Sequence, residues 1–507
     1  GSKDLARKMA SSHLPSMAAP STSTALSLLA AFLFLLCFFQ EGYVNGGGEA
    51  AEDISGLQSN QTHHLLQTSS LRPPTLCKSS PNGHGRSSTL PVHHRHGPCI
   101  DAIHSRLGHA RAAPPTAGEI LSADQSRVDA IRSRLERGRT PDGFRGSKAT
   151  TLPAASGGAI GSGSYIVTVG IGTPKRDLSL VFDTGSDLTW IQCRPCAGVC
   201  YPQRQPLFDP ARSATYSNVT CDSVRCAELF SGTGVPRSCA GPTCLYGIQY
   251  GDLSFSMGFL ATERLTLTPA DVFGGFVFGC GEDNEGLFGG AAGLLGLAGD
   301  QFSFVSQTAR RYGRVFSYCL PSSSGTTGFL TFGDGGASGE TQYTPLLAGS
   351  PAGSLYFVDL VEITVGGRRL GVPASSFLEG GTLIDSGTVI TRLPPDAYGA
   401  LRAEFRRLMS RYPASRPVSI LDTCYDLRRH GAVALPKIGL VFRGGAEVAM
   451  DPSGILYAGS ASQACLAFAG NGDAGGVAII GNVQQRTIEV VYDVARGRVG
   501  FGAGRCS

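Results

Sequence analysis

Short apolar runs alternate with turn residues over most of the chain after residue 165. The runs are rich in β-branched and aromatic residues and are bounded by Gly, Pro, Asp and Ser. Examples are Tyr165–Gly170, Leu178–Phe182, Gly275–Gly279 and Leu355–Leu360. Runs of this length and composition between turn signals are typical of β-strands. The pattern therefore predicts an all-β fold from residue 165 to the C-terminus.

Two segments have helical spacing instead. After Pro394 and Pro395, apolar residues at positions 398, 401, 405, 408 and 412 share one face, and arginines occupy the other. In the N-terminal third, the segment 122–137 places Val128, Ile131 and Leu135 on one face. We expect a helix in each segment. The arginine face is interpreted as solvated, with an anionic partner as the alternative.

The first 163 residues differ from the rest in composition and in the pattern of apolar residues. Basic residues precede an unbroken apolar run, Ala25–Phe39, which is short for a membrane span and typical of a signal peptide. Residues 1–40 are therefore interpreted as a signal region, with a signal anchor as the alternative. Residues 41–156 are rich in His, Ser, Pro, Gly and Arg and predict a propeptide, followed by a Gly/Ser linker. The expected location is the secretory pathway and cell exterior, with vacuole or chloroplast as alternatives.

Charge and histidine content limit which ligands and catalytic mechanisms are possible for residues 157–507. Residues 1–156 hold 16 basic and 11 acidic residues, and residues 157–507 hold 27 and 28. The net charge of −1 in the larger part argues against nucleic acid as its main ligand. Nine of the ten histidines precede residue 110, so a Ser-His or Cys-His pair there has to use His430. A histidine-rich metal site is excluded there, and we expect no metal and no cofactor.

Cysteine usage agrees with secretion. Twelve cysteines follow residue 190, and an even number behind a signal peptide predicts six disulfides. They are Cys193, Cys196, Cys200, Cys221, Cys226, Cys239, Cys244, Cys280, Cys319, Cys424, Cys465 and Cys506. The close spacing of the first three leaves zinc binding as a minor alternative. Sequons at Asn60 and Asn218 predict N-glycosylation.

An internal repeat carries the most information. Val181–Ser186 (VFDTGS) recurs as Leu383–Thr388 (LIDSGT), with the two aspartates 202 residues apart. Each copy is followed by two apolar residues and a glycine, at 294–296 and 479–481. Two halves with the same signals in the same order predict two similar β lobes. We place these lobes at residues 157–342 and 343–507.

The repeated Asp is suited to acid–base chemistry. An apolar strand that ends in Asp-Thr/Ser-Gly delivers a carboxyl group at a tight turn. Two such turns face to face bring Asp183 and Asp385 so close that they share one proton. The charged member can then take a proton from water, and the protonated member can give one to a leaving nitrogen. The pair therefore indicates hydrolysis of peptide bonds without metal, histidine or a covalent intermediate.

The sequence from about residue 165 to residue 506 resembles the pepsin-like aspartic protease family. The segment Phe182–Trp190 and the dense cysteine insert Cys193–Cys244 behind it resemble the plant nepenthesin-like group. The resemblance implies a bilobal β fold with the active-site cleft between the lobes. It also implies that Asp183 and Asp385 are the catalytic pair of an endopeptidase that acts on proteins or peptides, and the expected state is a monomer.

The resemblance also implies roles for the residues around the aspartates. The supporting residues are Thr184, Gly185, Ser186, Ser386, Gly387 and Thr388. Thr184 and Ser386 are expected to tie the two loops together, and Ser186 and Thr388 to hydrogen-bond the carboxylates from outside. Tyr250 matches the tyrosine of the flap that closes over substrate, and Trp190 its indole partner. Leu253 departs from the family pattern, in which glycine is usual.

A disulfide pairing follows from the same resemblance. The implied pairs are Cys193–Cys196, Cys200–Cys280, Cys221–Cys244, Cys226–Cys239, Cys319–Cys506 and Cys424–Cys465. The last-but-one of these ties the end of the first lobe to the C-terminus.

The segment Leu90–Cys99 resembles the prosegment of a plant subgroup that includes a chloroplast nucleoid DNA-binding protease. In it, His93, His94 and His96 form a histidine cluster that we hypothesise to act as a pH trigger. Two competing functions stay open. One is a catalytically silent binding protein like the plant xylanase inhibitors, and the other is DNA binding through the basic N-terminal third.

Overall fold

The computed structural model describes the chain in twelve stretches. They are residues 62–78, 88–105, 115–139, 165–250, 254–286, 288–333, 340–348, 353–378, 380–460, 462–472, 476–504 and 506. The predicted signal region, the sequon at Asn60 and the flap residue Leu253 lie outside the described residues. Within the described stretches, no helix is both long enough and apolar enough to cross a bilayer.

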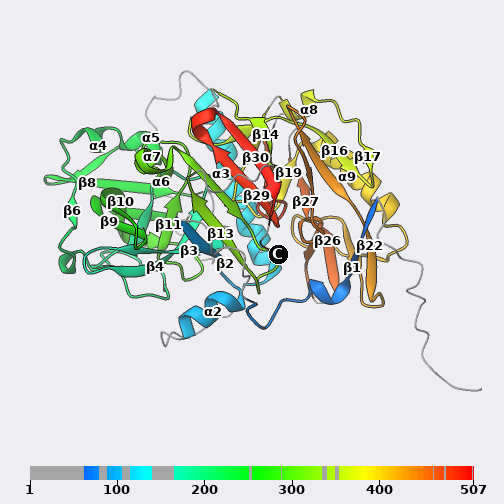
Figure 1. Cartoon of the computed structure of the whole chain (residues 1–507), viewed down its shortest axis with the longest axis horizontal. Coiled ribbons are helices and arrows are strands. Elements are labelled where there is room, and N and C mark those ends of the chain that lie inside the picture. The colour runs from blue at the N-terminus through cyan, green and yellow to red at the C-terminus, as the bar shows by residue number, and fades with distance from the viewer. Residues whose placement is uncertain are drawn as a thin grey trace, which may run out of the picture. The chain divides into compact units, whose positions relative to one another are not determined.

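The first lobe is built on one large, mainly antiparallel sheet (Figure 1). Its described strands, in spatial order, are β14 (Gln342–Pro345), β30 (Arg498–Ala503), β29 (Ile488–Asp493), β12 (Val315–Cys319), β13 (Thr327–Phe332), β2 (Thr89–His94), β3 (Tyr165–Ile171), β4 (Arg176–Asp183), β11 (Gly293–Gly296), β5 (Trp190–Gln192), β10 (Asp271–Glu285), β9 (Phe255–Thr268), β8 (Thr243–Gln249) and β7 (Ser238–Ala240). A further strand, β6 (Ser217–Asn218), pairs with β9. The C-terminal strands β29 and β30 thus extend a sheet that begins in the first lobe.

The second lobe contains three smaller sheets. The first has the order β15 (Phe357–Val358), β18 (Thr382–Ile384), β28 (Ala478–Ile480), β19 (Thr391–Leu393) and β27 (Phe468–Gly470). The second has the order β17 (Arg368–Arg369), β16 (Leu360–Val365), β23 (Ile438–Phe442) and β24 (Glu447–Ala449). The third has the order β20 (Ala414–Ser415), β21 (Cys424–Asp426), β26 (Gln463–Leu466) and β25 (Leu456–Ala458). The all-β, two-lobe prediction is confirmed.

Short helices connect the strands, and two helices of the described residues are longer than three turns. The short ones are α2 (Pro98–Ser105), α4 (Val224–Ala227), α5 (Leu229–Thr233), α6 (Phe304–Gln307), α7 (Ala309–Tyr312), α8 (Ser375–Leu378) and α10 (Pro452–Ile455), with single 3-10 turns at Thr68–Leu71, Pro210–Arg212 and Val494–Arg496. The longer ones are α3 (Ala117–Arg139) and α9 (Pro395–Leu408). Both lie where helical spacing predicted a helix.

The arginine face of α9 is paired with carboxylates of its own lobe. Arg402 lies 2.6 Å from an oxygen of Asp422, and Arg407 lies 2.7 Å from Glu404 one turn away. On the opposite face, Leu401 is fully buried in the core. These contacts agree with the solvated-surface interpretation. They favour no anionic partner for this helix.

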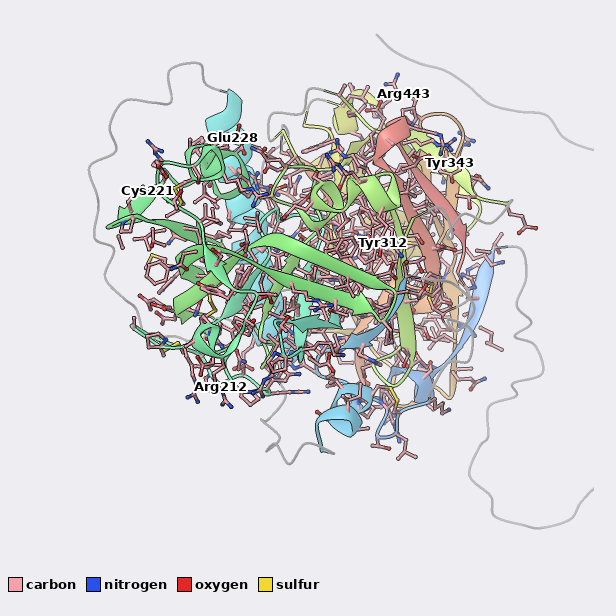
Figure 2. All side chains as sticks on the ribbon, turned by 60° about the vertical axis from the view of Figure 1, so that its left-hand side comes forward. Arg212, Cys221, Glu228, Tyr312, Tyr343 and Arg443 are labelled. Atoms are coloured by element: carbon pink, nitrogen blue, oxygen red, sulfur yellow. A yellow bond between two sulfur atoms is a disulfide. The ribbon has the colours of Figure 1, made fainter. Side chains whose placement is uncertain are left out.

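Aromatic side chains fill the interior of the first lobe. Figure 2 labels Tyr312 among these side chains. Tyr312 stacks on Phe332 with ring centroids 5.6 Å apart, and Phe304 packs against Phe332 at 4.5 Å. These rings are buried together with the apolar faces of β3 and β4. Burial of large aromatic surface supplies much of the driving force for folding such a sheet. It holds the end of β4, and with it the first Asp, in a fixed place.

The repeated glycine motifs lie directly beside the aspartate strands. β11 pairs in parallel with β4 and places Gly296 opposite Asp183, and β28 pairs in parallel with β18 in the same way. A Cβ at Gly296 would lie 2.1 Å from the carbonyl oxygen of Asp187, and one at Gly481 would lie 2.5 Å from that of Val389. Only glycine permits this approach of two backbones. The two halves of the repeat therefore build equivalent structures, as the sequence predicts.

The predicted propeptide contributes strands to the folded chain. β2 lies between β13 and β3 in the large sheet, and β1 (His63–Gln67) pairs with β22 (Ala432–Pro436) of the second lobe. A disulfide joins Cys77 to Cys99. The sequence indicated only a helix in this region, because strands of five or six residues with few apolar positions give little periodic signal.

Two of the predicted disulfides are present as expected. Cys319–Cys506 joins the end of β12 to the C-terminus, beside the pairing of β12 with β29. Cys424–Cys465 links residues that face each other across β21 and β26.

The other four predicted pairs were wrong: Cys193–Cys196, Cys200–Cys280, Cys221–Cys244 and Cys226–Cys239. The structure contains Cys193–Cys280, Cys196–Cys200, Cys221–Cys239 and Cys226–Cys244. Parallel pairing of β5 with β10 carries Cys193 past the end of β5 to Cys280, which leaves Cys196 and Cys200 to close a short loop. Spacing along the chain carries no information on this strand pairing.

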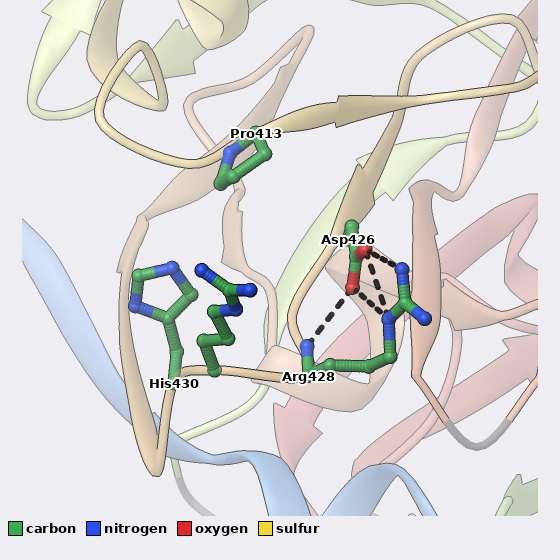
Figure 3. A pocket seen from close by; sticks show the side chains of 5 residues that line it. Pro413, Asp426, Arg428 and His430 are labelled. Atoms are coloured by element: carbon green, nitrogen blue, oxygen red, sulfur yellow. Dashed lines mark hydrogen bonds and ion pairs between the residues drawn. The ribbon is translucent and has the colours of Figure 1, made fainter.

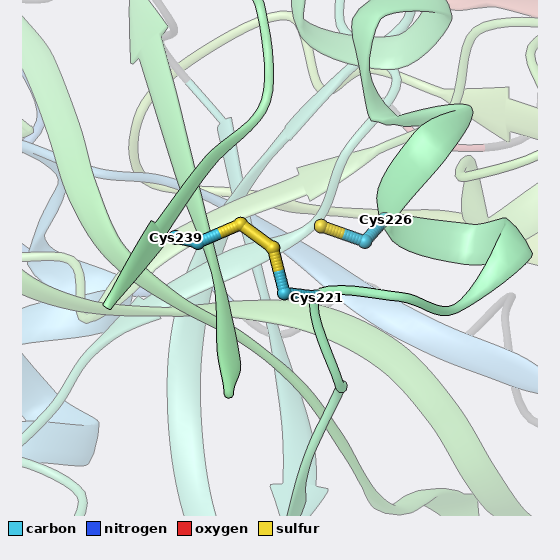
Figure 4. Close-up of side chains that lie close together, drawn as sticks. All are labelled: Cys221, Cys226 and Cys239. Carbon is cyan, nitrogen blue, oxygen red and sulfur yellow. A yellow bond between two sulfur atoms is a disulfide. The ribbon is translucent and has the colours of Figure 1, made fainter. Parts of the chain in front are cut away.

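The remaining two wrong pairs involve the cluster of Cys221, Cys226, Cys239 and Cys244. Cys239 and Cys244 face each other across β7 and β8, so cysteines at 221 and 226 approach both. Figure 4 shows Cys221 bonded to Cys239, with the sulfur of Cys226 beside them. The sulfurs of these three residues lie within 4.8 Å of one another, a spacing that three thiolates could use for a metal. Because all three are in disulfides, the cluster acts as a cross-link.

Candidate active site

Two equivalent loops place Asp183 and Asp385 in the interior. Asp183 ends β4 and Asp385 directly follows β18, and their exposed fractions are 1% and 0%. The backbone N–H of Gly185 donates to Asp183 Oδ1 at 2.9 Å, and that of Gly387 donates to Asp385 Oδ1 at 3.0 Å. Each carboxylate is therefore oriented by the glycine of its own motif.

The hydroxyl residues of the two motifs make the contacts that the resemblance implied. The N–H of Thr184 donates to Ser386 Oγ at 3.1 Å, and the N–H of Ser386 donates to Thr184 Oγ1 at 2.9 Å. These two bonds tie the loops together across the two lobes. Outside them, Ser186 Oγ donates to Asp183 Oδ2, and Thr388 Oγ1 donates to Asp385 Oδ2 at 2.5 Å.

Glycine in each motif lets the carboxylates approach from both sides. A Cβ at Gly185 would lie 2.8 Å from Asp385 Oδ1, and a Cβ at Gly387 would lie 2.5 Å from Asp183 Oδ1. Each glycine is thus in contact with the carboxylate of the opposite loop. A side chain at either place would push the two acids apart.

A third charged residue, Arg127 of α3, lies between the two aspartates. Its Nη2 lies 2.7 Å from Asp183 Oδ1 and 3.0 Å from Asp385 Oδ1. Its Nε donates to Asp385 Oδ2 at 3.0 Å, and its Nη1 donates to Asp183 Oδ2 at 3.2 Å. Every oxygen of both carboxylates therefore accepts a hydrogen bond from one guanidinium. In Figure 1, α3 (cyan) runs between strands of the two lobes.

The two carboxyl groups have opposite pKa shifts. Burial raises the pKa of Asp183, but Arg127 and the donors Ser186 and Gly185 outweigh it, so this pKa lies below its ordinary value. Burial raises the pKa of Asp385 above its ordinary value, and the charge of Asp183 raises it further, although Arg127 opposes both effects. The two carboxyl groups therefore differ in acidity, and Asp183 is the stronger acid of the pair.

The rest of α3 matches its surroundings in both polarity and charge. Val128, Ile131 and Leu135 are buried in one cluster with apolar residues that include Leu383 and Ile479, which flank the second aspartate motif. Three polar side chains of α3 contact the two lobes. Asp124 accepts a hydrogen bond from the loop after Asp385, Arg132 donates to Asn471, and Arg134 is paired with Asp187.

The sequence missed these polar contacts. Helical spacing identifies the apolar face alone, and an arginine on a predicted helix is more often solvated. A usable signal was the position of Arg127 next to Val128, at the edge of the apolar face.

Trp190 and Tyr250 are in direct contact. The indole N–H of Trp190 donates to the hydroxyl of Tyr250 at 2.7 Å. Phe288, which the sequence did not single out, packs edge-on against Trp190 with ring centroids 4.9 Å apart and lies 5.9 Å from Tyr250. Trp190 is fully buried, and Tyr250 is partly exposed at the end of β8. The contact between them is present, and their role in closing over substrate stays a prediction.

His430 belongs to a separate pocket. A cavity of about 380 Å³ is lined by Pro413, Asp426, Arg428, Arg429 and His430 (Figure 3). The ring of His430 packs edge-on against Tyr412, with centroids 5.0 Å apart. None of the residues that line the pocket is a serine or a cysteine, so no nucleophile faces His430 there.

Asn218 is exposed on β6. Its side-chain oxygen accepts a hydrogen bond from Tyr216 at 2.6 Å. Glycosylation at this position stays a prediction.

Two β lobes joined at a symmetric pair of Asp-Thr/Ser-Gly loops define an aspartic protease of the two-lobe class. Comparison with known proteins agrees. Family models described as "Xylanase inhibitor N-terminal" and "Xylanase inhibitor C-terminal" match residues 165–334 and 355–503. The chain therefore belongs to the plant group of the pepsin-like aspartic protease family, and by class it is an aspartic endopeptidase.

Three relatives illustrate the match. An aspartyl protease family protein of Arabidopsis thaliana is 53% identical over 455 residues, covering 89% of this chain and 95% of its own length. Aspartyl protease AED1 of the same plant is 45% identical over 477 residues, covering 94% and 98%. Aspartic proteinase nepenthesin-2 of Nepenthes gracilis is 37% identical over 357 residues, covering 68% and 78%.

Solved structures support the fold alone. Soybean basic 7S globulin superposes with a TM-score of 0.53 at 21% identity, covering 67% of this chain and 91% of that one. Conglutin gamma from lupine seeds has a TM-score of 0.54 at 21% identity, covering 69% and 92%.

Proposed function

We propose that the chain, once freed of its N-terminal segment, hydrolyses peptide bonds with a water molecule activated between Asp183 and Asp385. The charged carboxylate takes a proton from the water as its oxygen attacks the peptide carbonyl. The protonated carboxyl donates to the carbonyl oxygen, and a proton then passes to the leaving nitrogen. The observation that carries this proposal is the symmetric pair of buried carboxyl groups, each held by the glycine and the hydroxyl residue of its own motif.

We further propose that the full-length chain is an inactive proenzyme. The guanidinium of Arg127 occupies the position between the carboxylates that an activating water needs, because it bonds to all four of their oxygens. The apolar face of α3 covers Leu383 and Ile479 beside the second aspartate. Activity then requires that residues 41–156 leave this site.

Acid release of the propeptide is supported by the histidine cluster. Burial lowers the pKa of His93 to about 4, of His94 to about 3 and of His96 to about 2. The ordinary value is 6.5 for each. A released segment therefore binds more protons than a docked one below that pH, and docking weakens as the pH falls. Arg95 lies against His96 and opposes its protonation further.

The remaining features are proposals that rest on the sequence. The apolar run at 25–39 and the disulfides support synthesis into the secretory pathway and an extracellular location, with vacuole or chloroplast as alternatives. Glycosylation is proposed from the two sequons, and a monomeric state from the family resemblance. The expected partners are protein or peptide substrates, with no metal ion. DNA binding is not favoured, because residues 157–507 have a net charge of −1.

A single assay tests the main proposal. The processed protein is offered denatured globular protein between pH 2 and 7, beside an Asp183→Asn variant and with pepstatin added. We expect activity on the acid side of this range that both treatments abolish. Activity that survives either treatment would contradict the two-carboxyl mechanism.

A catalytically silent binding protein is the second candidate, because the matching family models are described as xylanase inhibitors. The complete set of aspartates, hydroxyl residues and flap pair argues against it. Absence of any proteolysis by the processed form, together with tight binding of a glycan-degrading enzyme, would favour this candidate instead.

A further inference from the structure

A fully enclosed carboxylate site lies next to the second aspartate loop. Asp124 of α3 occupies it with an exposed fraction of 0%. The backbone N–H of Val389 donates to its Oδ1 at 2.6 Å, and the N–H of Ile390 donates to its Oδ2 at 3.1 Å. Nη2 of Arg392 lies 3.0 Å from the same Oδ2. Two backbone donors and one guanidinium thus surround a single carboxylate.

The donors and the acceptor of this site belong to different parts of the chain. Val389, Ile390 and Arg392 follow the second aspartate motif, whereas Asp124 lies in the predicted propeptide. Arg392 is 1% exposed, and within the described residues Asp124 is the one carboxylate in ion-pair distance of it. Its Nη2 has a second acceptor, Gln125 Oε1 at 3.4 Å, which is also on α3. Removal of α3 therefore takes away the counter-charge of a buried cation.

The site that remains is built to hold an anion. Nη1 of Arg392 stays bonded to the carbonyl oxygen of Ile390 at 2.7 Å, which fixes the guanidinium in place. Its Nε is buried without a partner in the described part of the chain. Val389, Ile390 and Val483 pack in the apolar cluster at this loop. Charge-assisted hydrogen bonds gain strength in such apolar surroundings, and an uncompensated buried charge is costly.

We propose that the mature enzyme uses Arg392 and the N–H groups of Val389 and Ile390 as a subsite for an acidic side chain, Asp or Glu, of its peptide substrate. This inference rests on the proposed function, because it assigns a substrate preference to the same active site. A neutral or basic side chain leaves the guanidinium unpaired. A carboxylate restores each contact that Asp124 makes in the proenzyme.

The position of the site limits which substrate residue it can hold. Asp124 precedes Arg127 by three residues, which is about 4.5 Å along a helix axis. An extended peptide advances about 3.3 Å per residue. The acidic residue is therefore expected roughly one to three residues from the bond that is cut. Val389 follows directly after Thr388, which itself bonds to Asp385, so the two sites are continuous.

The test measures kcat/KM of the processed enzyme on a set of matched peptides. Each peptide carries one Asp at a different distance from the cleaved bond, and each has a partner with Asn at the same place. The assay is run near pH 5, where a peptide aspartate is ionised. We expect one position at which Asp is preferred over Asn by roughly ten- to a hundredfold, as for hydrogen bonds to a charged group.

Two variants separate the subsite from other effects. Arg392→Gln should lose the preference for Asp over Asn at that position, read as the ratio of the two kcat/KM values within the variant. Arg368→Gln is the matched control, because Arg368 lies in the same lobe with a side chain 73% exposed, and it should keep the preference. If Arg392→Gln does not fold, the wild-type peptide series decides alone.

The outcomes distinguish this inference from the proposed function. Cleavage of every peptide with equal kcat/KM for Asp and Asn at all positions overturns the acidic subsite and leaves the protease intact. A preference for Asp that persists in Arg392→Gln also overturns it. Failure to cleave any peptide contradicts the proposed function itself.

Discussion

Replacement of Arg127 by glutamine is the sharpest test of how the proenzyme is kept inactive. The substitution keeps a polar side chain, shortens it, and removes the charge from the centre of the two aspartates. The arginine side chain is 13% exposed, and its partners are 1% and 0% exposed. All of the interaction therefore takes place away from bulk water.

The expected size of the effect follows from this burial. Removal of one partner from a buried ion pair costs about 3–5 kcal/mol. At about 1.4 kcal/mol per factor of ten, docking of α3 over the aspartates weakens by roughly two to three orders of magnitude. The apolar contacts of Val128, Ile131 and Leu135 remain, so we expect partial rather than complete release. Hydrolysis by the intact variant should then rise at least about tenfold over the wild-type proenzyme.

The assay follows peptide hydrolysis in the first minutes after the full-length protein is mixed with substrate at acidic pH. A gel taken at each time confirms that the chain is still intact. Arg72→Gln is the matched control, because Arg72 also lies in the predicted propeptide and is exposed. After processing, all three proteins should have the same kcat/KM, because none of them retains residue 127. An Arg127→Gln proenzyme that stays as inactive as the wild type would refute the reasoning.

Three further predictions concern the propeptide and the flap. Replacement of the histidine cluster by glutamine should move activation to lower pH, because glutamine cannot take up the protons that the released histidines bind below pH 6.5. An unchanged pH profile of activation would count against the trigger. A Cys77→Ser, Cys99→Ser double variant opens a loop of 22 residues and should lower the stability of the proenzyme by about 3 kcal/mol, seen as a lower Tm, with no change in the processed enzyme. Trp190→Phe removes the 2.7 Å bond to Tyr250 and should lower kcat/KM several-fold, and a Tyr250→Phe, Trp190→Phe double variant should be no worse than the sum of the single effects.

The sequence predicted the aspartate pair well because its signals are local. The strand, the Asp, the hydroxyl residue and the glycine are adjacent in the chain at both Asp183 and Asp385, so one short motif contains most of each loop. Repetition then indicated that the two loops meet. The hydrogen bonds between Thr184 and Ser386 complete that arrangement in the structure.

The disulfides and the propeptide contacts depend on long-range pairing, and the sequence was weaker there. Cys193 reaches Cys280 only because β5 and β10 are parallel neighbours, which no local spacing encodes. Arg392 gave no signal either, since its partner Asp124 lies 268 residues earlier in the chain. In each case the missing information is which strand or helix lies beside which.

The charges of α3 complement those of the surface that it covers. Asp124 meets the cation Arg392, Arg127 meets the two aspartates, and Arg134 lies 3.5 Å from Asp187.

These ion pairs respond differently to acid. Burial raises the pKa of Asp187 to about 6, although Arg134 lowers it, so this carboxyl becomes neutral and its attraction to Arg134 is lost below about pH 6. The histidine cluster weakens docking of β2 over the same range, whereas the pKa of Asp183 lies below its ordinary value, so its pairing with Arg127 persists in stronger acid. Acidification should therefore loosen β2 and the C-terminal half of α3 first. The contact of Arg127 with the aspartates then breaks last. Its loss completes the release of the propeptide and exposes the catalytic pair at the same time.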